Sequence, residues 1–370
     1  MNNKTKTILI GYNTTHYAWM FRRNLVEEFL ALDYRVIVVA PVDEYVQKLE
    51  SLGVSHINIK MQMNANPVSD LFLFFRYCGI FMKWRPDFFL GYTAKPNIYG
   101  TLAAKLFGTK VINNIAGLGS VFLKKNVVTF FLKSLYRLAL QYSDQVFFQN
   151  QDDLQEFLKS KIITHNRYDV LPGSGVDLKK FQYTELAYRD GMDFLFIGRL
   201  IRDKGIYEFI AAAKKLLSEQ DDLRFKILGA VGGDNPTAIS ASSLAKDLAG
   251  TSIEYIGFKE DVLPFITAAT CVVLPSYREG TPKCLLEAAA VGRPIVTTNA
   301  PGCKDVVDEG VNGYVCCVAD EQSLYDALKK LSSLSLQQLT KMGLAGRSKI
   351  VNQYDERIVI NRYLEAVQQS

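Results

Sequence analysis

The chain has 370 residues, of which 48% are hydrophobic and 22% charged, and its formal net charge is +5. This composition excludes a disordered chain, and the length exceeds what one compact core usually needs, so we expect two domains. The six cysteines show no C-x-x-C spacing and only three histidines are present, which argues against a zinc site and a disulfide framework.

Neither the N-terminus nor any internal segment has the pattern of a targeting or membrane-spanning element. Residues 1–13, MNNKTKTILIGYN, lack the long apolar core and the small-residue cleavage site of a signal peptide. The longest apolar stretch, Leu71–Met82, is interrupted by Arg76 and is well short of the ~20 residues that span a bilayer. We therefore expect a cytoplasmic protein that is neither secreted nor transmembrane.

Short strand-like runs alternate with longer segments of helical periodicity. The strand-like runs are Thr7–Gly11, Arg35–Ala40, His56–Ile59, Phe88–Gly91, Lys110–Asn113, Gln145–Phe148, Asp193–Ile197, Arg224–Leu228, Ser252–Ile256, Cys271–Leu274 and Pro294–Thr297. The helical segments of the first half are Trp19–Leu32, Pro67–Lys83, Asn97–Phe107 and Val127–Tyr142. This alternation predicts an α/β protein with parallel sheets.

A turn-rich polar segment, residues 171–186, separates the two series of elements, and we expect it to be a linker. The pattern predicts two Rossmann-like, doubly wound domains, over residues 1–175 and 187–350. Residues 351–370 would form a C-terminal helix whose attachment the sequence leaves open, packing on the N-terminal domain being one option. Ligands of such sheets bind beyond the carboxyl ends of the strands, in a cleft that the two domains would face.

The first candidate site lies in residues 194–216, where Arg199 and Lys204 follow a predicted strand and precede a helix that begins near Gly205. Two cations beside a strand end and a helix N-terminus suit a diphosphate, which needs positive charge and free N–H donors. The alternative interpretation is that both are solvated loop charges.

The second candidate lies in residues 276–298, where Glu279 and Glu287 flank a turn and the start of a helix. Pro282 suits the first helical turn, so the amides of Gly280, Thr281 and Lys283 would point at an anion. Glu287 sits one turn further along, in an Ala- and Leu-rich helix where burying its charge requires a partner. The alternative for Glu287 is an exposed helix position, and two glutamates at this spacing are by themselves a weak pattern.

The segments GRLIRDKG and EGTPKCLLEAAAVGRPIVTTNAPGCKDVV together resemble the C-terminal lobe of retaining glycosyltransferases of family four, which have the two-lobed GT-B fold. The resemblance implies that Arg199 and Lys204 bind the donor diphosphate and that Glu279 contacts the donor sugar. It implies further that Glu287 binds the ribose and that Gly257, in the piece Gly257–Val262, belongs to the nucleotide-base region. On this basis Arg199, Lys204 and Glu279 are the expected catalytic residues.

The pieces YTAKPNIYG (92–100) and AGLGSVF (116–122) resemble a narrower branch of that family. Its members build capsule, O-antigen and other glycan chains on polyprenyl diphosphate in bacteria and include N-acetylgalactosaminyltransferases. The resemblance therefore implies a nucleotide-sugar donor, UDP-linked by preference, and a lipid-linked saccharide acceptor.

One departure from the family concerns the N-terminal lobe. Many members carry a His after the fifth strand, but this chain reads NNIAGLGS there and has Ala116. The narrower branch also tends to lack this His. We assign Gly117 and Gly119 to a loop where the backbone approaches a ligand.

No D-x-D sequence occurs in the chain, so we expect no metal on the diphosphate and assign its neutralisation to Arg199, Lys204 and helix-end amides. The implied chemistry is transfer with retention at the anomeric carbon. The acceptor hydroxyl would attack on the leaving-group side, and the departing phosphate oxygen would take its proton.

Two further residues are candidates for the acceptor side. His16 lies in a predicted strand-helix loop, and Lys95 lies in another, where it could meet an acceptor phosphate. A structural role for His16 and a plain surface position for Lys95 are the alternatives.

Three other functions were weighed. A sugar-nucleotide 2-epimerase can share this fold, but it needs acid/base carboxylates and His in the cleft that the sequence does not clearly supply. A nucleic-acid-binding protein could use the basic half, but no motif that interleaves aromatic and basic residues supports it. A non-catalytic nucleotide-sugar-binding partner of a larger machine stays open because of the missing His.

Charge and amphipathicity also suggest a membrane partner. Residues 1–180 hold 22 basic and 14 acidic residues, whereas residues 181–370 hold 21 and 24. Residues 122–142 combine Lys124, Lys125, Lys133 and Arg137 with Phe and Leu, as an interfacial helix does, and Leu71–Lys83 is a weaker candidate. An ordinary helix with one buried face is the alternative. We expect peripheral attachment to the inner face of the cell membrane, and the sequence does not indicate an oligomeric state.

Overall fold

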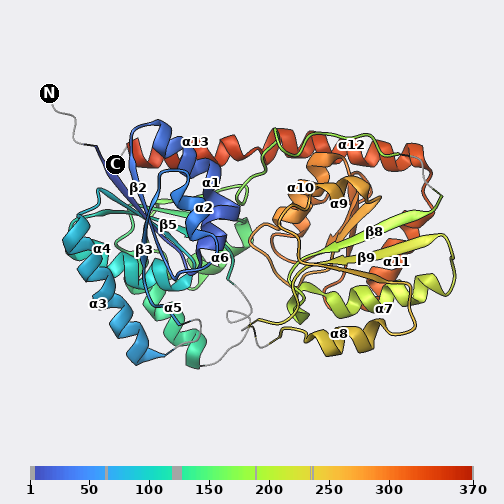
Figure 1. Cartoon of the computed structure of the whole chain (residues 1–370), viewed down its shortest axis with the longest axis horizontal. Helices are drawn as coiled ribbons and strands as arrows, with labels where there is room; N and C mark the ends of the chain where they lie inside the picture. The colour runs from blue at the N-terminus through green and yellow to red at the C-terminus, as the bar shows by residue number, and fades with distance from the viewer. Residues whose placement is uncertain are drawn as a thin grey trace. The chain divides into compact units, whose positions relative to one another are not determined.

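The computed structural model describes residues 5–62, 66–118, 127–187, 190–233, 235 and 237–368. The chain divides into two compact units. In Figure 1 the first unit is coloured from blue to green, apart from its red C-terminal segment, and the second from green to red. Unit 1 comprises Met1–Ser174 and Arg357–Ser370, and unit 2 comprises Gly175–Glu356. The C-terminal segment therefore returns to the unit in which the chain begins.

Unit 1 contains a seven-stranded sheet whose described strand pairs are all parallel, in the order β3-β2-β1-β4-β5-β6-β7. Its strands are β1 (Thr7–Gly11), β2 (Arg35–Ala40), β3 (Ser55–Asn58), β4 (Phe88–Tyr92), β5 (Lys110–Ile115), β6 (Gln145–Phe148) and β7 (Tyr168–Val170). The central strands are continuous apolar runs that are buried on both faces, as parallel strands covered by helices on both sides must be.

The helices of unit 1 connect these strands. They are α1 (Thr15–Ala31), α2 (Val46–Glu50), α3 (Pro67–Trp84), the π-helical turn η1 (Pro96–Gly100), α4 (Thr101–Leu106), α5 (Val127–Leu140), α6 (Gln151–Lys159) and the C-terminal α13 (Glu356–Gln368). Their starts follow local rules. Asn66 caps α3 by accepting from the Ser69 N–H, with Pro67 in the first turn, and Asn150 caps α6 in the same way.

Unit 2 contains a six-stranded sheet whose described pairs are also parallel, in the order β10-β9-β8-β11-β12-β13. Its strands are β8 (Met192–Ile197), β9 (Leu223–Leu228), β10 (Glu254–Gly257), β11 (Cys271–Leu274), β12 (Ile295–Thr298) and β13 (Gly313–Cys316). Its helices are the 3-10 turn η3 (Arg202–Lys204), α7 (Ile206–Leu217), α8 (Ala241–Leu248), α9 (Leu263–Ala268), α10 (Lys283–Val291), the 3-10 turn η4 (Lys304–Val306), α11 (Glu321–Ser332) and α12 (Leu336–Gln353).

The strand orders locate one switch point in each sheet. In unit 1 the chain moves outward from β1 to β3 and then restarts beside β1 with β4; in unit 2 it does the same at β8 and β11. Ligands of doubly wound sheets bind beyond the carboxyl ends of the two strands at this point. The α/β fold with two parallel, doubly wound sheets that the sequence predicted is therefore confirmed.

The helix α13 packs into the core of unit 1. Val359, Ile360, Tyr363 and Val367 are buried in the same apolar cluster as Ile8 of β1. Within the described residues, no helix is both long enough and apolar enough to cross a bilayer.

One expected helix is divided in the structure, and two strands are present that were not expected. The single helix expected over Asn97–Phe107 is a π-helical turn followed by α4. The edge strands β7 and β13 were not predicted: β7 has only half-buried residues, and β13 begins at a glycine.

Candidate functional site

The switch point of unit 2 brings together the loops that follow β8 and β11. Arg199 follows the end of β8, and Lys204 ends the 3-10 turn that leads into α7. Ser276 and Glu279 follow β11. Because β8 and β11 are adjacent parallel strands, both loops leave the same edge of the sheet.

Gly205 allows the two loops to pack closely. Its φ is +74°, and a Cβ there would lie 2.0 Å from the Pro275 carbonyl oxygen. The loops are also hydrogen-bonded, because the Tyr277 N–H (2.8 Å) and the Ser276 hydroxyl (3.0 Å) both donate to the Asp203 carbonyl. The position of Lys204 beside the β11 loop therefore depends on a residue without a side chain.

Lys204 and Glu279 form an ion pair in this loop cluster. Their side chains are only 19% and 13% exposed, and the Ser276 hydroxyl donates to the same carboxylate oxygen at 2.7 Å. The two sequence motifs are therefore in contact, because Lys204 of one forms an ion pair with Glu279 of the other. Sequence reasoning assigned no role to Ser276, whose only signal was its place at the start of the segment 276–298 that contains Glu279.

The loop after β12 supports the backbone around Glu279. The Glu279 N–H donates to the Pro301 carbonyl at 3.1 Å. Gly302 has φ +77°, and a Cβ there would lie 2.2 Å from the Gly280 carbonyl oxygen. Three strand-end loops therefore fix the conformation of the turn that precedes α10.

The helix α10 begins at this turn. Pro282 is its N-cap residue, in an extended conformation, so it precedes the helix and does not occupy the first turn as expected. A proline with ψ of 109° ends the extended segment, and the helix starts at Lys283. The Cys284 thiol donates to the Ile197 carbonyl at 3.4 Å, which attaches the first turn of α10 to the end of β8. Gly280 and Thr281 lie in the preceding turn.

Glu287 is one turn into α10 and is only 6% exposed. The Lys283 ammonium lies 3.8 Å from its carboxylate, a loose ion pair along the helix. Burial raises the pKa of Glu287, an effect that Lys283 and Lys180 oppose and Asp261 reinforces. The exposed-helix alternative is therefore wrong, and the buried carboxylate is available to a hydrogen-bond donor from a ligand.

Two other predicted residues lie at the same edge of the sheet. The Arg199 side chain is exposed and makes no hydrogen bond or ion pair with the part of the chain that the structure describes. Gly257 ends β10 with φ +83°, and its carbonyl accepts from the Gly229 N–H at 3.0 Å. No cluster of three His, Cys, Asp or Glu side chains with the arrangement of a metal site occurs among the described residues.

In unit 1, His16 lies in the first turn of α1, beyond the carboxyl end of β1. Its backbone N–H donates to Asp43 at 3.2 Å, and its ring meets the Tyr45 ring edge-on with centroids 4.5 Å apart. Asp43 also accepts from the Thr15 and Tyr45 amides, and although burial opposes the shift, these bonds lower its pKa. No sequence motif pointed to Asp43.

Lys95 follows β4 and is paired with Asp70 of α3. The Tyr99 hydroxyl donates to the same carboxylate at 3.2 Å, and the Lys95 side chain is only 15% exposed. The plain surface position that was the alternative for Lys95 is therefore wrong. Thr93, at the start of the same loop, has φ +62°, a conformation that a β-branched residue adopts only when its surroundings impose it.

Gly117 follows β5 with φ +116°, which only glycine adopts readily. Gly119 lies outside the described residues, as do Lys124 and Lys125 of the proposed interfacial segment. Two other basic residues of that segment contact α6 or the residue after it. Lys133 bonds Glu156 at 2.7 Å, and Arg137 donates to the Ser160 carbonyl at 2.9 Å. The ion pair joins Lys133 of α5 to α6, and the interfacial role expected of residues 122–142 stays a prediction.

The unit 2 site combines exposed positive charge, a helix N-terminus and two poorly exposed carboxylates. Arg199 and the first amides of α10 favour an anionic group. The carboxylates of Glu279 and Glu287 are hydrogen-bond acceptors suited to hydroxyl groups. The arrangement suits a ligand that has both a negatively charged group and hydroxyls.

Sequence comparisons place both units among known families. The family described as "Glycosyl transferases group 1" matches residues 191–333, and the one described as "Glycosyl transferase 4-like" matches residues 11–150. The chain is 30% identical over 366 residues to the N,N'-diacetylbacillosaminyl-diphospho-undecaprenol alpha-1,3-N-acetylgalactosaminyltransferase of Campylobacter jejuni, with 93% of this chain and 94% of the relative covered. It is 26% identical over 325 residues to the capsular polysaccharide biosynthesis glycosyltransferase CapM of Staphylococcus aureus, with 83% and 82% covered.

The fold is also that of a solved structure with a bound nucleotide. The Anabaena protein HepE in complex with UDP superposes with a TM-score of 0.79 at 15% identity, over 99% of this chain and 100% of that protein. At this identity the likeness shows a shared two-sheet fold.

Proposed function

The chain belongs to the glycosyltransferase family, and we propose that it transfers a hexose or an N-acetylhexosamine from a UDP-sugar to a saccharide linked to a polyprenyl diphosphate. The relative from Campylobacter jejuni, named for an N-acetylgalactosaminyl transfer to a diphospho-undecaprenol-linked sugar, supports this acceptor class. Its similarity extends over 93% of this chain and therefore includes both units.

The observation that carries the proposal is the meeting of Lys204, Ser276 and Glu279 at the switch point of unit 2, beside the start of α10. Arg199, Lys204 and the amides of Gly280 and Thr281 would bind the donor diphosphate. A bound diphosphate would compete with Glu279 for the Lys204 ammonium, which would release the carboxylate to accept bonds from sugar hydroxyls.

Glu287 would bind the ribose of the donor. A ribose diol offers two hydroxyl donors to one carboxylate, and a buried carboxylate with one loose ion pair gains more from them than an exposed one. Gly257 at the end of β10 would let the nucleotide base approach the backbone. Pro282 would hold the turn that presents the α10 amides.

Transfer would proceed with retention and with no metal on the diphosphate. As the bond to the anomeric carbon breaks, negative charge grows on the leaving phosphate, and Arg199 and Lys204 would stabilise it more strongly than in the ground state. The acceptor hydroxyl would attack from the side of the leaving group. Its proton would pass to the departing phosphate oxygen.

Unit 1 would bind the acceptor through the strand-end loops that contain His16, Lys95, Gly117 and Gly119. If the chain only bound a nucleotide sugar for another enzyme, these loops would have no catalytic role. The strained backbone at Thr93, two residues before Lys95, supports a binding role, because such strain concentrates at functional sites.

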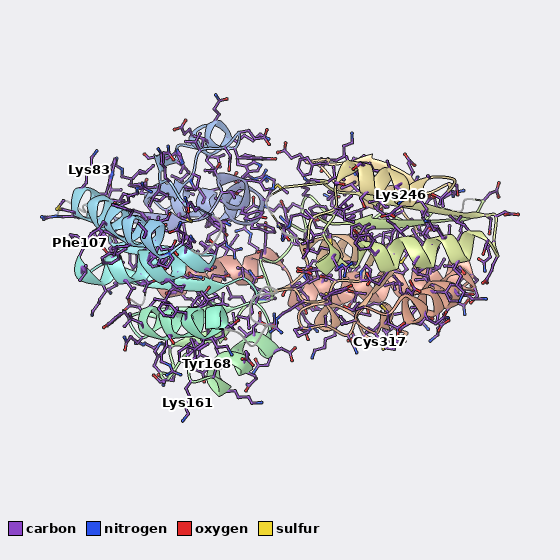
Figure 2. All side chains as sticks on the ribbon, turned by 90° about the horizontal axis from the view of Figure 1, so that it is seen from below. Lys83, Phe107, Lys161, Tyr168, Lys246 and Cys317 are labelled. Atoms are coloured by element: carbon purple, nitrogen blue, oxygen red, sulfur yellow. The ribbon has the colours of Figure 1, made fainter. Side chains whose placement is uncertain are left out.

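We place the protein on the cytoplasmic face of the membrane that holds its acceptor. Exposed apolar side chains of α3 and α5 support this: Val68, Leu71, Phe72, Phe75, Met82, Phe130, Phe131 and Leu138. A surface of this kind on a monomer usually meets a partner or a membrane. Figure 2 shows Lys83 and Phe107, two further side chains at the surface of unit 1.

The deciding experiment is calorimetric titration of UDP, GDP and ADP into wild type and Glu287→Ala, without added metal. We expect UDP alone to bind and the substitution to weaken binding at least tenfold. Equal binding to the variant would refute the donor-site assignment. Incubation with the UDP-sugar then separates the activities, because a transferase forms its product only when an acceptor is present, whereas an epimerase converts the donor alone.

A further inference from the structure

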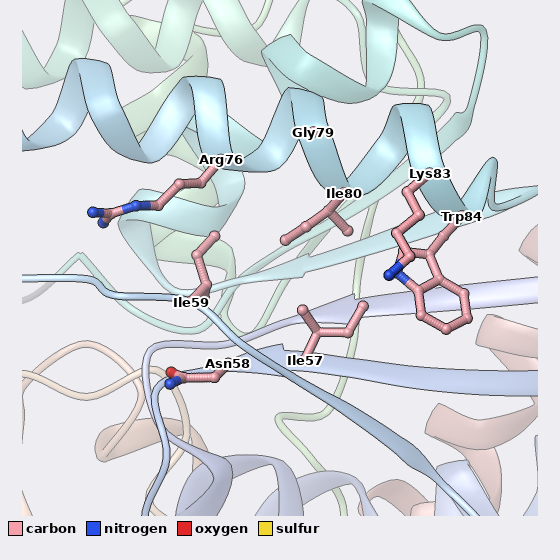
Figure 3. A pocket seen from close by; sticks show the side chains of 8 residues that line it. All are labelled: Ile57, Asn58, Ile59, Arg76, Gly79, Ile80, Lys83 and Trp84. Atoms are coloured by element: carbon pink, nitrogen blue, oxygen red, sulfur yellow. The ribbon is translucent and has the colours of Figure 1, made fainter.

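A groove on unit 1 lies between α3 and the edge strand β3, away from the switch point of the sheet. Its volume is about 310 Å³, and its lining comes from Ile57–Ile59 on one side and from α3 on the other. Figure 3 shows Ile57, Ile59 and Ile80 between the two elements, with Arg76 towards one end and Trp84 at the other. None of the functions proposed above uses this groove.

The floor of the groove is apolar. Ile59 is buried, and Ile57, Ile80 and Trp84 are half-buried, so each leaves part of its side chain in contact with water. Gly79 contributes no side chain, and a Cβ there would meet no atom within 4 Å. The groove is therefore open where α3 passes over it and can admit a chain-like apolar group.

The rim of the groove is cationic. Arg76 and Lys83 are both exposed and lie two turns apart on α3, roughly 10 Å along the helix axis. Arg76 is oriented by its bond to the Lys60 carbonyl at 2.8 Å, and the guanidinium of Arg35 lies 4.7 Å from the Trp84 ring. The lining segments, Ile57–Ile59 and Arg76–Trp84, contain no acidic residue. The positive charge at the rim of the groove therefore favours an anionic ligand.

The helix α3, which forms one side of the groove, also carries exposed apolar side chains that are proposed above to meet the membrane. Phe72 and Phe75 precede Arg76, and Met82 precedes Lys83; all three apolar side chains are exposed. A ligand that binds here would therefore place a charged group beside cations and an apolar group beside a surface that is itself apolar. Tryptophan commonly lies at the boundary between these two environments.

We propose that this groove binds an anionic phospholipid, with the headgroup phosphate between Arg76 and Lys83 and the upper part of an acyl chain over Ile57 and Ile80. The proposal rests on the proposed membrane association and adds to it a defined lipid site. Inorganic phosphate would use the same cations but would leave the apolar floor exposed to water. A lipid satisfies both parts of the groove.

The test uses Trp84 as a reporter. The chain has two tryptophans, so Trp19→Phe leaves Trp84 as the only one. We expect its fluorescence to shift to shorter wavelength with phosphatidylglycerol vesicles, but not with phosphatidylcholine vesicles or with inorganic phosphate. Arg76→Gln with Lys83→Gln should abolish the shift and lower binding to the anionic vesicles by roughly 30-fold, because each cation near such a surface contributes about 1 kcal/mol.

The matched control removes the same charge from unit 2. Lys214→Gln with Lys246→Gln alters two exposed lysines of α7 and α8 and should leave the shift unchanged. Urea unfolding of every variant checks that unit 1, which carries Arg76 and Lys83, is still folded. Anionic vesicles that bind wild type and the Arg76/Lys83 variant equally, with no shift of Trp84, would overturn the groove proposal while membrane association stands. Failure of wild type to bind any vesicle would refute both, and a shift with inorganic phosphate alone would exclude a lipid.

Discussion

Lys204 and Glu279, 75 positions apart in the sequence, form an ion pair at the carboxyl edge of the second sheet. The pair keeps a cation and a carboxylate in place at the site proposed for the donor. A diphosphate that binds as proposed would therefore have to draw Lys204 away from Glu279.

Substitution of Lys204 is expected to slow turnover more than it weakens donor binding. Lys204→Ala should lower kcat by about 10²–10³-fold, the effect of removing one stabiliser of charge in the transition state. It also leaves Glu279 without its cation, so some stability is lost. The double variant Lys204→Met/Glu279→Gln removes both charges and should recover that stability without recovering activity. Steady-state kinetics and urea unfolding measure the two effects. A loss of less than tenfold for both Lys204→Ala and Arg199→Ala would refute the assignment.

Glu287→Gln is expected to stabilise the free protein while weakening nucleotide binding. Burial raises the pKa of Glu287, so the folded state favours the neutral carboxyl. The neutral Glu287 carboxyl therefore contributes its full share of the free energy of unfolding at pH values below its pKa in the unfolded chain. This contribution is lost as the pH rises through its pKa in the folded protein. At pH 7 the variant should therefore be more stable by on the order of 1 kcal/mol.

The pH dependence provides the control for Glu287→Gln. Towards about pH 4 the carboxyl is increasingly protonated in both states, so the difference in unfolding free energy should shrink. Urea unfolding at several pH values measures it, and calorimetry with UDP measures the loss of binding. A variant that is less stable at pH 7 would show that the Lys283 ion pair outweighs burial.

Gly205→Ala is expected to disturb the site through the backbone. Any side chain at φ +74° costs about 1–2 kcal/mol, and here the Cβ would also meet the Pro275 carbonyl oxygen at 2.0 Å. Gly250 is the matched control, because its φ is +72° and no atom lies within 4 Å of a Cβ there. Urea unfolding should show at least twice the loss for Gly205→Ala, and only this variant should lose activity. An equal loss of unfolding free energy in the two variants would mean that the loops after β8 and β11 can move apart to admit the Cβ without destabilising the protein.

The central strands and the edge strands β3 and β10 were predictable from the sequence, but the edge strands β7 and β13 were not. β1, β2, β6 and β11 have the bounds that their apolar, β-branched runs indicated. These strands are buried on both faces, so their sequences are constrained along their whole length. The edge strand β7 has only half-buried residues, and its pattern cannot be distinguished from that of a loop.

The residues of the candidate site were predictable, but their mutual contacts were not. Motif spacing indicated Lys204, Glu279 and Glu287, because each belongs to a short pattern. The Lys204–Glu279 pair depends on the adjacency of β8 and β11, which are separated by β9 and β10 in the sequence. Asp70, the partner of Lys95, comes from a helix that precedes the Lys95 loop and carries no motif.

Removal of exposed phenylalanines from α5 should weaken membrane binding. Phe130 and Phe131 are 71% and 64% exposed, so their substitution by Ser should change the free energy of unfolding little. Each ring that enters the membrane interface contributes about 2 kcal/mol, and binding to anionic vesicles should fall at least tenfold. The control is Leu344→Ser with Val351→Ser on α12, which removes exposed apolar side chains from unit 2. Vesicle flotation measures binding, and equal binding by both double variants would exclude α5 from the interface.

Tyr363 of α13 is expected to fix the C-terminal helix to unit 1 through its ring. The buried guanidinium of Arg22 lies 4.8 Å from the Tyr92 ring and 5.7 Å from the Tyr363 ring, so it is held between α13 and β4. Tyr363→Leu removes one aromatic face from a desolvated cation and should cost about 2–3 kcal/mol. Tyr363→Phe retains the face and should cost less than about 1 kcal/mol. Urea unfolding measures both, and trypsin cleavage at Arg357, the first residue of the returning segment, should accelerate only in the Leu variant. Equal losses in the two variants would assign the stabilisation to the hydroxyl group instead of the ring.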